Sequence, residues 1–134
     1  GYENMDYDKV ISIFADSIKY YPSGVDSKMI EGIDLMKENI SFYMANFENA
    51  SFTQGSGLPG TDVAFWGGNT YPVSEAMSGP NNVRMYGSWD ITNSNTGKSV
   101  NFKQYCVWSF NEDGKVHTVT EYLDLGGLLA TFDE

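Results

Sequence analysis

The apolar residues of this chain change their spacing near residue 50, and this change constrains the fold more than any other feature. From Ala50 onward they alternate with polar residues, in segments separated by clusters of Gly, Asn and Pro. Before that point they recur three or four positions apart, as on one face of a helix: Ile30, Ile33, Met36, Ile40, Tyr43, Met44 and Phe47. Helical segments followed by a run of strands predict an α+β domain.

Two short elements are predicted ahead of the long helix. Asp6 is a suitable N-cap for a brief helix over residues 7–14, and residues 17–21 alternate as a short strand. Asp26 or Ser27 is expected to cap the long helix that follows. At 134 residues, we expect residues 1–134 to form one domain.

The C-terminal half predicts a consecutive antiparallel sheet. Residues 83–91 and 102–110 alternate around a turn at residues 93–97, so they are expected to form a hairpin. A second turn over residues 111–114, closed by a glycine, leads into a last strand over residues 116–124.

The segment Gly55–Pro80 is rich in Gly, Pro and Ser, and its course is left open. Residues 63–66 (VAFW) are expected to form a strand inside it. A flexible flap is the alternative.

Asp124 lies between apolar residues at the end of the last strand, so its orientation matters for function. If Gly114 forms a bulge in the turn, Cys106 pairs with Thr120 and Phe102 pairs with Asp124. Asp124 is then expected to face inward. An unpaired buried carboxylate would cost several kcal/mol, unless a partner, a raised pKa or a wet cavity relieves it.

The same register divides the other side chains between the two faces of the sheet. The inner, apolar face is expected to carry Trp89, Trp108, Cys106, Gln104 and Tyr122. The outer face is expected to carry His117, Glu121, Lys103, Arg84 and Asp90.

Three stretches carry a resemblance to a known family: residues 6–21 (DYDKVISIFADSIKYY), 31–52 (EGIDLMKENISFYMANFENASF) and 108–129 (WSFNEDGKVHTVTEYLDLGGLL). They resemble the nuclear transport factor 2-like superfamily, particularly its SnoaL-like (polyketide cyclase-like) branch. The resemblance implies a cone in which a curved antiparallel sheet wraps around helices and encloses a pocket. It also implies a homodimer formed through the outer sheet face.

Two departures from the family pattern limit what is carried over. The GYENM that precedes Asp6 matches at most the end of the family's usual first long helix. Tyr21 precedes Pro22 where the ketosteroid isomerases have a general-base Asp, so we reject that chemistry. Asp124 matches the acid/base Asp of the SnoaL-like cyclases, but the His that they carry in the neighbouring strand is missing.

Asp124 is therefore the candidate catalytic residue, and the alternative is a hydrogen-bonded polar residue near the mouth of the cone. Six residues are candidates for contacting a small apolar or aromatic ligand, and core packing is the alternative for them. They are Tyr122, Gln104, Trp108, Trp89, Tyr20 and Trp66.

No cofactor or metal is expected. Cys106 is the only cysteine, and it is more consistent with a small core residue than with a nucleophile. His117 and Glu121 share a strand face roughly 13 Å apart, which is too far for them to ligate one metal ion.

The net charge and the length of the apolar runs indicate whether nucleic acid or membranes are suitable partners. A formal net charge of −10 disfavours nucleic acid and anionic membrane surfaces, although it can also serve solubility alone. No run approaches the roughly 20 apolar residues of a membrane helix. We therefore expect a soluble protein, either cytoplasmic or exported with its leader removed.

Three functions remain open. The first is binding of a small, largely apolar molecule beside an inward-facing carboxylate. The second is cofactor-free acid/base catalysis by Asp124, of the cyclase, isomerase or dehydratase type. The third is an interaction module that dimerises through an outer face formed by Tyr86, Tyr105, Val107, Val119 and Leu123.

Overall fold

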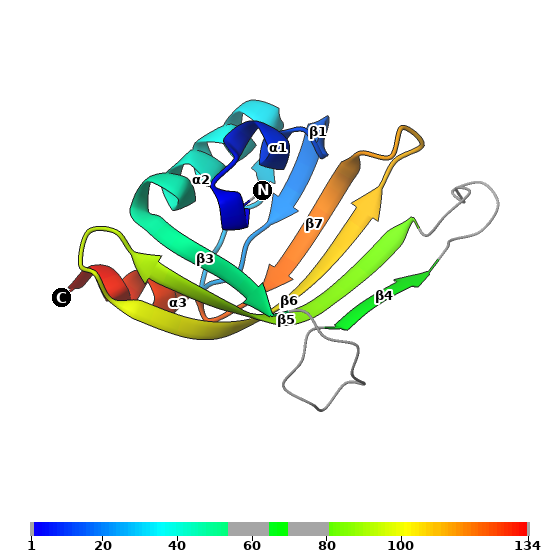
Figure 1. The fold of residues 1–134 in the computed structure, drawn as a ribbon. Helices are drawn as coiled ribbons and strands as arrows, with labels where there is room; N and C mark the ends of the chain where they lie inside the picture. The colour runs from blue at the N-terminus through cyan, green and yellow to red at the C-terminus, as the bar shows by residue number, and fades with distance from the viewer. Residues whose placement is uncertain (1, 54–64, 70–80, 134) are drawn as a thin grey trace.

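The computed structural model describes residues 2–53, 65–69 and 81–133, and these residues form a curved sheet with helices on its concave side (Figure 1). The strands are β1 (Phe14–Tyr21), β2 (Ile30–Glu31), β3 (Phe47–Thr53), β4 (Phe65–Asn69), β5 (Asn82–Asn93), β6 (Ser99–Phe110) and β7 (Val116–Tyr122). The helices are η1 (Tyr2–Asn4), α1 (Tyr7–Ile11), α2 (Ile33–Asn46), α3 (Leu125–Leu129) and η2 (Ala130–Asp133). The predicted α+β class is confirmed.

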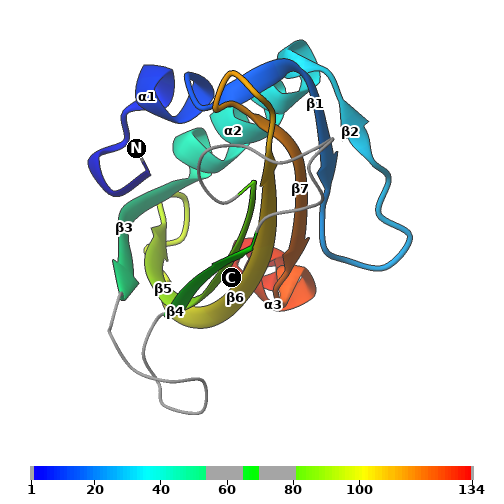
Figure 2. The ribbon, with the colours of Figure 1, turned by 90° about the vertical axis from the view of Figure 1, so that its right-hand side faces the viewer.

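The sheet has the order β2-β1-β7-β6-β5-β3, and β4 pairs with the same strand β5. Figure 2 shows the long strands β5 and β6 curling around the space below α2. All pairings are antiparallel except that of β1 with β7, which is parallel. No hairpin joins β1 to β7, so no tight turn forces these two strands to run in opposite directions.

The predicted start of the long helix is wrong. Ile30 and Glu31 form β2 and pair with Tyr20 and Lys19 of β1, so they extend the sheet. The N-cap of α2 is Gly32, whose φ of +92° turns the chain from strand to helix. Asp26 and Ser27 therefore lie in the connection before β2 and do not cap the helix.

The predicted brief helix is too long, because α1 ends at Ile11 and Phe14 already begins β1. The Asp6 cap, the hairpin and the Gly114 turn are confirmed. The Asp6 side chain accepts a hydrogen bond of 3.0 Å from the backbone N–H of Lys9, as expected of an N-cap. The hairpin of β5 and β6 forms as predicted, and Gly114 has a φ of +74° in the turn before β7. Residues 63 and 64 of the predicted strand lie outside the described residues, as does most of Gly55–Pro80.

The predicted register between the last two strands is wrong beyond its first pair. Phe110 pairs with Val116 as expected, but Ser109 pairs with Thr118, so His117 is an extra residue in β7. Because side chains alternate between the two faces, this bulge reverses the facing of every later residue of the strand. Cys106 consequently lies opposite Glu121, where Thr120 was expected.

The core lies between α2 and the concave face of the sheet. Ile18 of β1, Ile40 of α2 and Cys106 of β6 are almost completely buried there. Val119 is also buried in this core, although it was predicted on the outer face. Within the described residues, no helix has the length and apolar character needed to cross a membrane.

Candidate functional site

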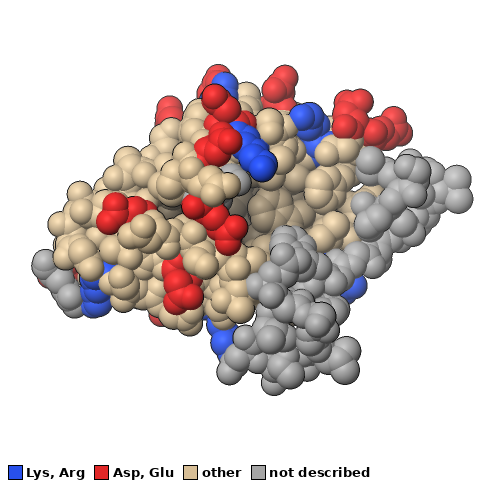
Figure 3. All heavy atoms as spheres, in the orientation of Figure 1, with Lys and Arg blue, Asp and Glu red and all other residues tan. Residues whose placement is uncertain are grey.

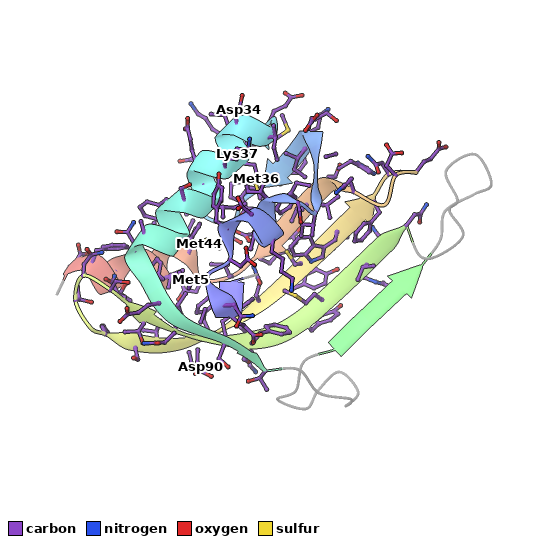
Figure 4. All side chains as sticks on the ribbon, turned by 45° about the horizontal axis from the view of Figure 1, so that its top comes forward. Met5, Asp34, Met36, Lys37, Met44 and Asp90 are labelled. Carbon is purple, nitrogen blue, oxygen red and sulfur yellow. The ribbon has the colours of Figure 1, made fainter. Side chains whose placement is uncertain are left out.

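A cavity of about 160 Å³ lies between α2 and the concave face of the sheet. Strands β1, β3, β5, β6 and β7 supply its walls, together with residues of α2, α3 and the N-terminal segment. Figure 3 shows that this face of the molecule is hollowed near its centre. In Figure 4, Met36 lies on α2 and Met5 lies ahead of α1, and both line the cavity.

Glu121 of β7 places its carboxylate on the wall of this cavity. The Tyr20 hydroxyl of β1 donates a hydrogen bond to its Oε1 atom. The Gln104 amide of β6 donates to its Oε2 atom over 3.1 Å. Side chains from two other strands, β1 and β6, therefore hold the carboxylate of β7 in place.

Gln104 is itself oriented by a neighbour. The indole Nε1 of Trp89 on β5 donates to the Oε1 atom of Gln104 over 2.9 Å. This contact fixes which end of the amide is the donor, so the Nε2 group of Gln104 faces Glu121. The result is a polar chain from Trp89 through Gln104 to Glu121 and Tyr20.

Ser23 fixes the end of β7 beside the carboxylate. Its hydroxyl donates to the backbone carbonyl of Glu121 over 2.8 Å. The same oxygen accepts from the backbone N–H of Leu123, also over 2.8 Å. The loop after β1 thereby restrains the backbone on both sides of Tyr122.

Burial raises the pKa of the Glu121 carboxyl above its ordinary value of 4.5, because the cavity wall solvates the charge poorly. The side-chain hydrogen bonds from Tyr20 and Gln104, and a backbone hydrogen bond from Ser23, act in the opposite direction. Burial and the neighbouring Glu121 raise the pKa of Tyr43 to about 12. The same two causes raise the pKa of Tyr20 far above its ordinary range, and that of the Cys106 thiol above its own.

Asp124 does not face the cavity. It is exposed at the N-cap of α3, where its Oδ1 atom accepts a hydrogen bond of 2.8 Å from the backbone N–H of Gly127. The predicted inward orientation of Asp124 is therefore wrong, and the reason is the bulge at His117.

The other predicted site residues are divided between two places. Tyr20, Gln104, Trp89 and Trp108 line the cavity. Tyr122 is 59% exposed on the opposite face of the sheet, so it does not belong to the wall. Trp66 lies in β4 with its backbone opposite Met85, and its side chain lies outside the described residues.

Trp108 carries a buried indole N–H that has no hydrogen-bond partner among the described residues. Its ring stacks on Phe14 at a centroid distance of 6.3 Å and an interplanar angle of 23°. Stacking of this kind fits the core-packing interpretation of Trp108.

Sequence reasoning missed the residues that the bulge turns inward: Val119, Glu121 and Leu123. One signal was available. Val116 and Val119 are three positions apart, which breaks the strict alternation of a regular strand. Among the described residues, no group of three His, Cys, Asp or Glu side chains is placed to hold a metal ion.

The sequence matches no protein-family model and no curated protein. Solved structures are similar over almost the whole chain. A candidate polyketide cyclase from Xanthomonas campestris pv. campestris gives a TM-score of 0.71 at 11% identity, covering 97% of this chain and 87% of that one. BvnE pinacolase from Penicillium brevicompactum gives a TM-score of 0.69 at 14% identity, and the match covers 98% of this chain and 83% of the pinacolase.

A third structure carries the name of the fold. It is a nuclear transport factor 2-like protein of unknown function from Exiguobacterium sp. 255-15, with a TM-score of 0.64 at 14% identity, covering 92% of this chain and 95% of that one. The chain has the nuclear transport factor 2-like fold. The fold expected from the SnoaL-like resemblance is thereby confirmed, and this fold hosts enzymes as well as a protein without a known activity.

Proposed function

We propose that this nuclear transport factor 2-like domain binds a small, largely apolar molecule in the cavity below α2, with Glu121 as the polar anchor. The observation that carries the proposal is the Glu121 carboxylate, which Tyr20 and Gln104 hold on an otherwise mostly apolar wall. Concave apolar sites with a few fixed polar groups are typical of small-molecule binding.

The size of the cavity limits the ligand. A dry cavity of about 150 Å³ in another protein holds one benzene molecule. The cavity here is about 160 Å³, so a ligand of about one ring fits without rearrangement. We therefore propose that the small apolar or aromatic ligand expected from the sequence is limited to about one ring.

Methionine methyl groups offer a direct test of binding. Met36 and Met85 line the cavity, whereas Met29 is 40% exposed and lies outside it. With ¹³C-methyl methionine, one-ring ligands should shift the signals of Met36 and Met85 and leave that of Met29 in place. Shifts of Met29 alone, or no shifts across a panel of ring compounds, would contradict the proposal.

Acid/base catalysis is the second candidate, and Glu121 replaces Asp124 in it. A carboxyl of raised pKa beside a hydroxyl donor can take a proton from a carbon acid and return it. The test is exchange of the α-hydrogens of a one-ring ketone such as phenylacetone in D₂O. Catalysed exchange by the wild type that Glu121→Gln abolishes and Asp124→Asn retains would support this function. Exchange at the buffer rate would contradict it for this substrate class.

A further inference from the structure

We propose that the cavity selects a small organic cation, namely a protonated amine carried on a single ring. This inference rests on the proposed binding function and deepens it by naming the class of ligand. It is carried by three features of the cavity: its charge, the direction of its hydrogen bonds and its aromatic walls.

The charge of the cavity is unbalanced. Among the described residues that line it, Glu121 is the only one with an ionisable acidic or basic side chain other than the tyrosines and Cys106. Two neutral side-chain donors hold the carboxylate, the Tyr20 hydroxyl and the Gln104 amide. A buried carboxylate without a cation is poorly stabilised, so a cationic ligand would supply the missing counter-charge.

The hydrogen bonds around Glu121 leave acceptor capacity for the ligand. The Gln104 amide uses its oxygen to accept from Trp89 and its nitrogen to donate to Glu121. The Tyr20 hydroxyl also donates to Glu121. Each carboxylate oxygen can accept more than one hydrogen bond, so Glu121 retains capacity for a ligand donor. An ammonium group offers donors alone, whereas an anionic ligand would meet the carboxylate with a like charge.

The walls near Glu121 suit a cation as well. Tyr20 contacts the carboxylate, and Trp89 is linked to it through Gln104. Tyr43 lies close enough for the Glu121 charge to raise its pKa. Aromatic side chains attract cations over their ring faces, most strongly where water is excluded. The formal net charge of −10 also favours the approach of cations over anions.

Two probe compounds of nearly equal shape test the inference. Benzylammonium carries the proposed cation, and benzyl alcohol replaces it with a neutral hydroxyl group. Their dissociation constants are measured at about pH 7 from the methyl signals of Met36 and Met85, which line the cavity. We expect the wild type to bind benzylammonium at least about tenfold more tightly than benzyl alcohol, because its hydrogen bond to Glu121 is charge-assisted.

Two variants assign this preference to the carboxylate. In Glu121→Gln, the preference for benzylammonium should fall to about one or reverse, while benzyl alcohol still binds and shows that the cavity is intact. Glu112→Gln removes an exposed carboxylate in the turn between β6 and β7, so it should keep the wild-type preference. Loss of the preference in Glu112→Gln would show that it arises from the net charge, which overturns the inference.

A measurement on the wild type keeps the inference testable if Glu121→Gln fails to fold. Saturation with benzylammonium should lower the pKa of Glu121, whereas benzyl alcohol should leave it unchanged or raise it. Equal binding of the two probes, with no change in this pKa, would overturn the cation inference and leave the binding function standing. Binding of neither probe would overturn both.

Discussion

Cys106 and Glu121 lie directly opposite each other across β6 and β7, and both face the cavity. The pairing places a carboxylate on the concave face of the sheet, four residues after the extra residue His117. The bulge therefore decides which acidic residue the cavity receives: Glu121 faces it and Asp124 caps α3.

The stability of the protein should depend on the titration of Glu121. Burial raises the pKa of this carboxyl above 4.5, so the folded state binds its proton more tightly than the unfolded chain does. This contribution to the unfolding free energy is present below about pH 4.5 and is lost as the pH rises through the folded-state pKa. Urea unfolding at several pH values should show that the wild type loses more stability than Glu121→Gln as the pH rises toward 7.

The exposed carboxylate of Glu112 supplies the control for that experiment. Glu112→Gln should keep the pH dependence of the wild type. An identical pH dependence in the wild type and in Glu121→Gln would show that Glu121 titrates alike in the folded and unfolded states.

Removing the hydroxyl of Tyr20 should destabilise the ionised form of Glu121. Tyr20→Phe deletes one of the two side-chain donors to the carboxylate, so we expect the pKa of Glu121 to rise further. Hydrogen bonds to charged groups contribute about 1.5–3 kcal/mol, so the unfolding free energy should fall by about that amount at neutral pH. The neighbouring Tyr21 is 42% exposed, and Tyr21→Phe should change neither quantity. Equal effects of the two variants would refute the role given to Tyr20.

The presence of an extra residue at position 117 of β7 should affect the unfolding free energy more than the identity of its side chain does. His117 is exposed, so His117→Ala should change the unfolding free energy by less than about 0.5 kcal/mol. Deletion of residue 117 should be severe, because it would turn Val119 and Glu121 outward and Thr120 inward. Chemical unfolding compares the two variants, and a deletion as stable as the substitution would contradict the bulge.

Asp124 should act on stability and not on binding. Asp124→Ala removes the N-cap of α3, which should cost about 1 kcal/mol of unfolding free energy, whereas Asp124→Asn should keep most of it. Both variants should bind one-ring ligands as the wild type does. A selective loss of binding in Asp124→Asn would return the candidate role to this residue.

A homodimer through the outer sheet face stays a prediction, but the residues expected at the centre of its interface change. Val119 is buried and Leu123 lines the cavity, so neither is available on that face. A stacked row of Tyr86, Tyr105 and Tyr122 occupies it, with centroid distances of 4.6 and 5.6 Å. We expect this row to pack against a second copy of the chain.

Sedimentation at tens of micromolar tests the dimer. The wild type should sediment as a dimer, and Tyr122→Lys should shift it toward the monomer. Leu35→Lys changes an exposed apolar residue on α2 and should leave the dimer intact. A monomeric wild type would contradict the prediction.

Much of the fold could be predicted because local signals agreed with the tertiary structure. Asp6 has a local capping contact, and the β5–β6 hairpin follows from alternation on both sides of a turn. The start of α2 could not be predicted in this way, because pairing with β1 draws Ile30 and Glu31 into the sheet. A capping signal at Asp26 does not reveal that competing long-range contact.

The site was predicted only in part, because the face of the sheet on which a side chain lies depends on the number of residues that precede it in the strand. Gln104 and Trp89 precede the bulge, and both line the cavity as expected. Tyr122 and Asp124 follow it and lie elsewhere. One extra residue reverses the face without changing the composition of the strand, so the hydrophobic pattern alone placed the wrong carboxylate inside.

The most direct test of the central claim is a carboxyl ¹³C NMR titration of Glu121 in the wild-type protein, with and without benzylammonium. A pKa above 4.5 that falls when benzylammonium binds is the predicted result, since it would show a desolvated carboxylate that meets the ligand. A pKa at or below 4.5 that the ligand does not change would contradict the account, because Glu121 would then be a well-solvated anion outside any binding site.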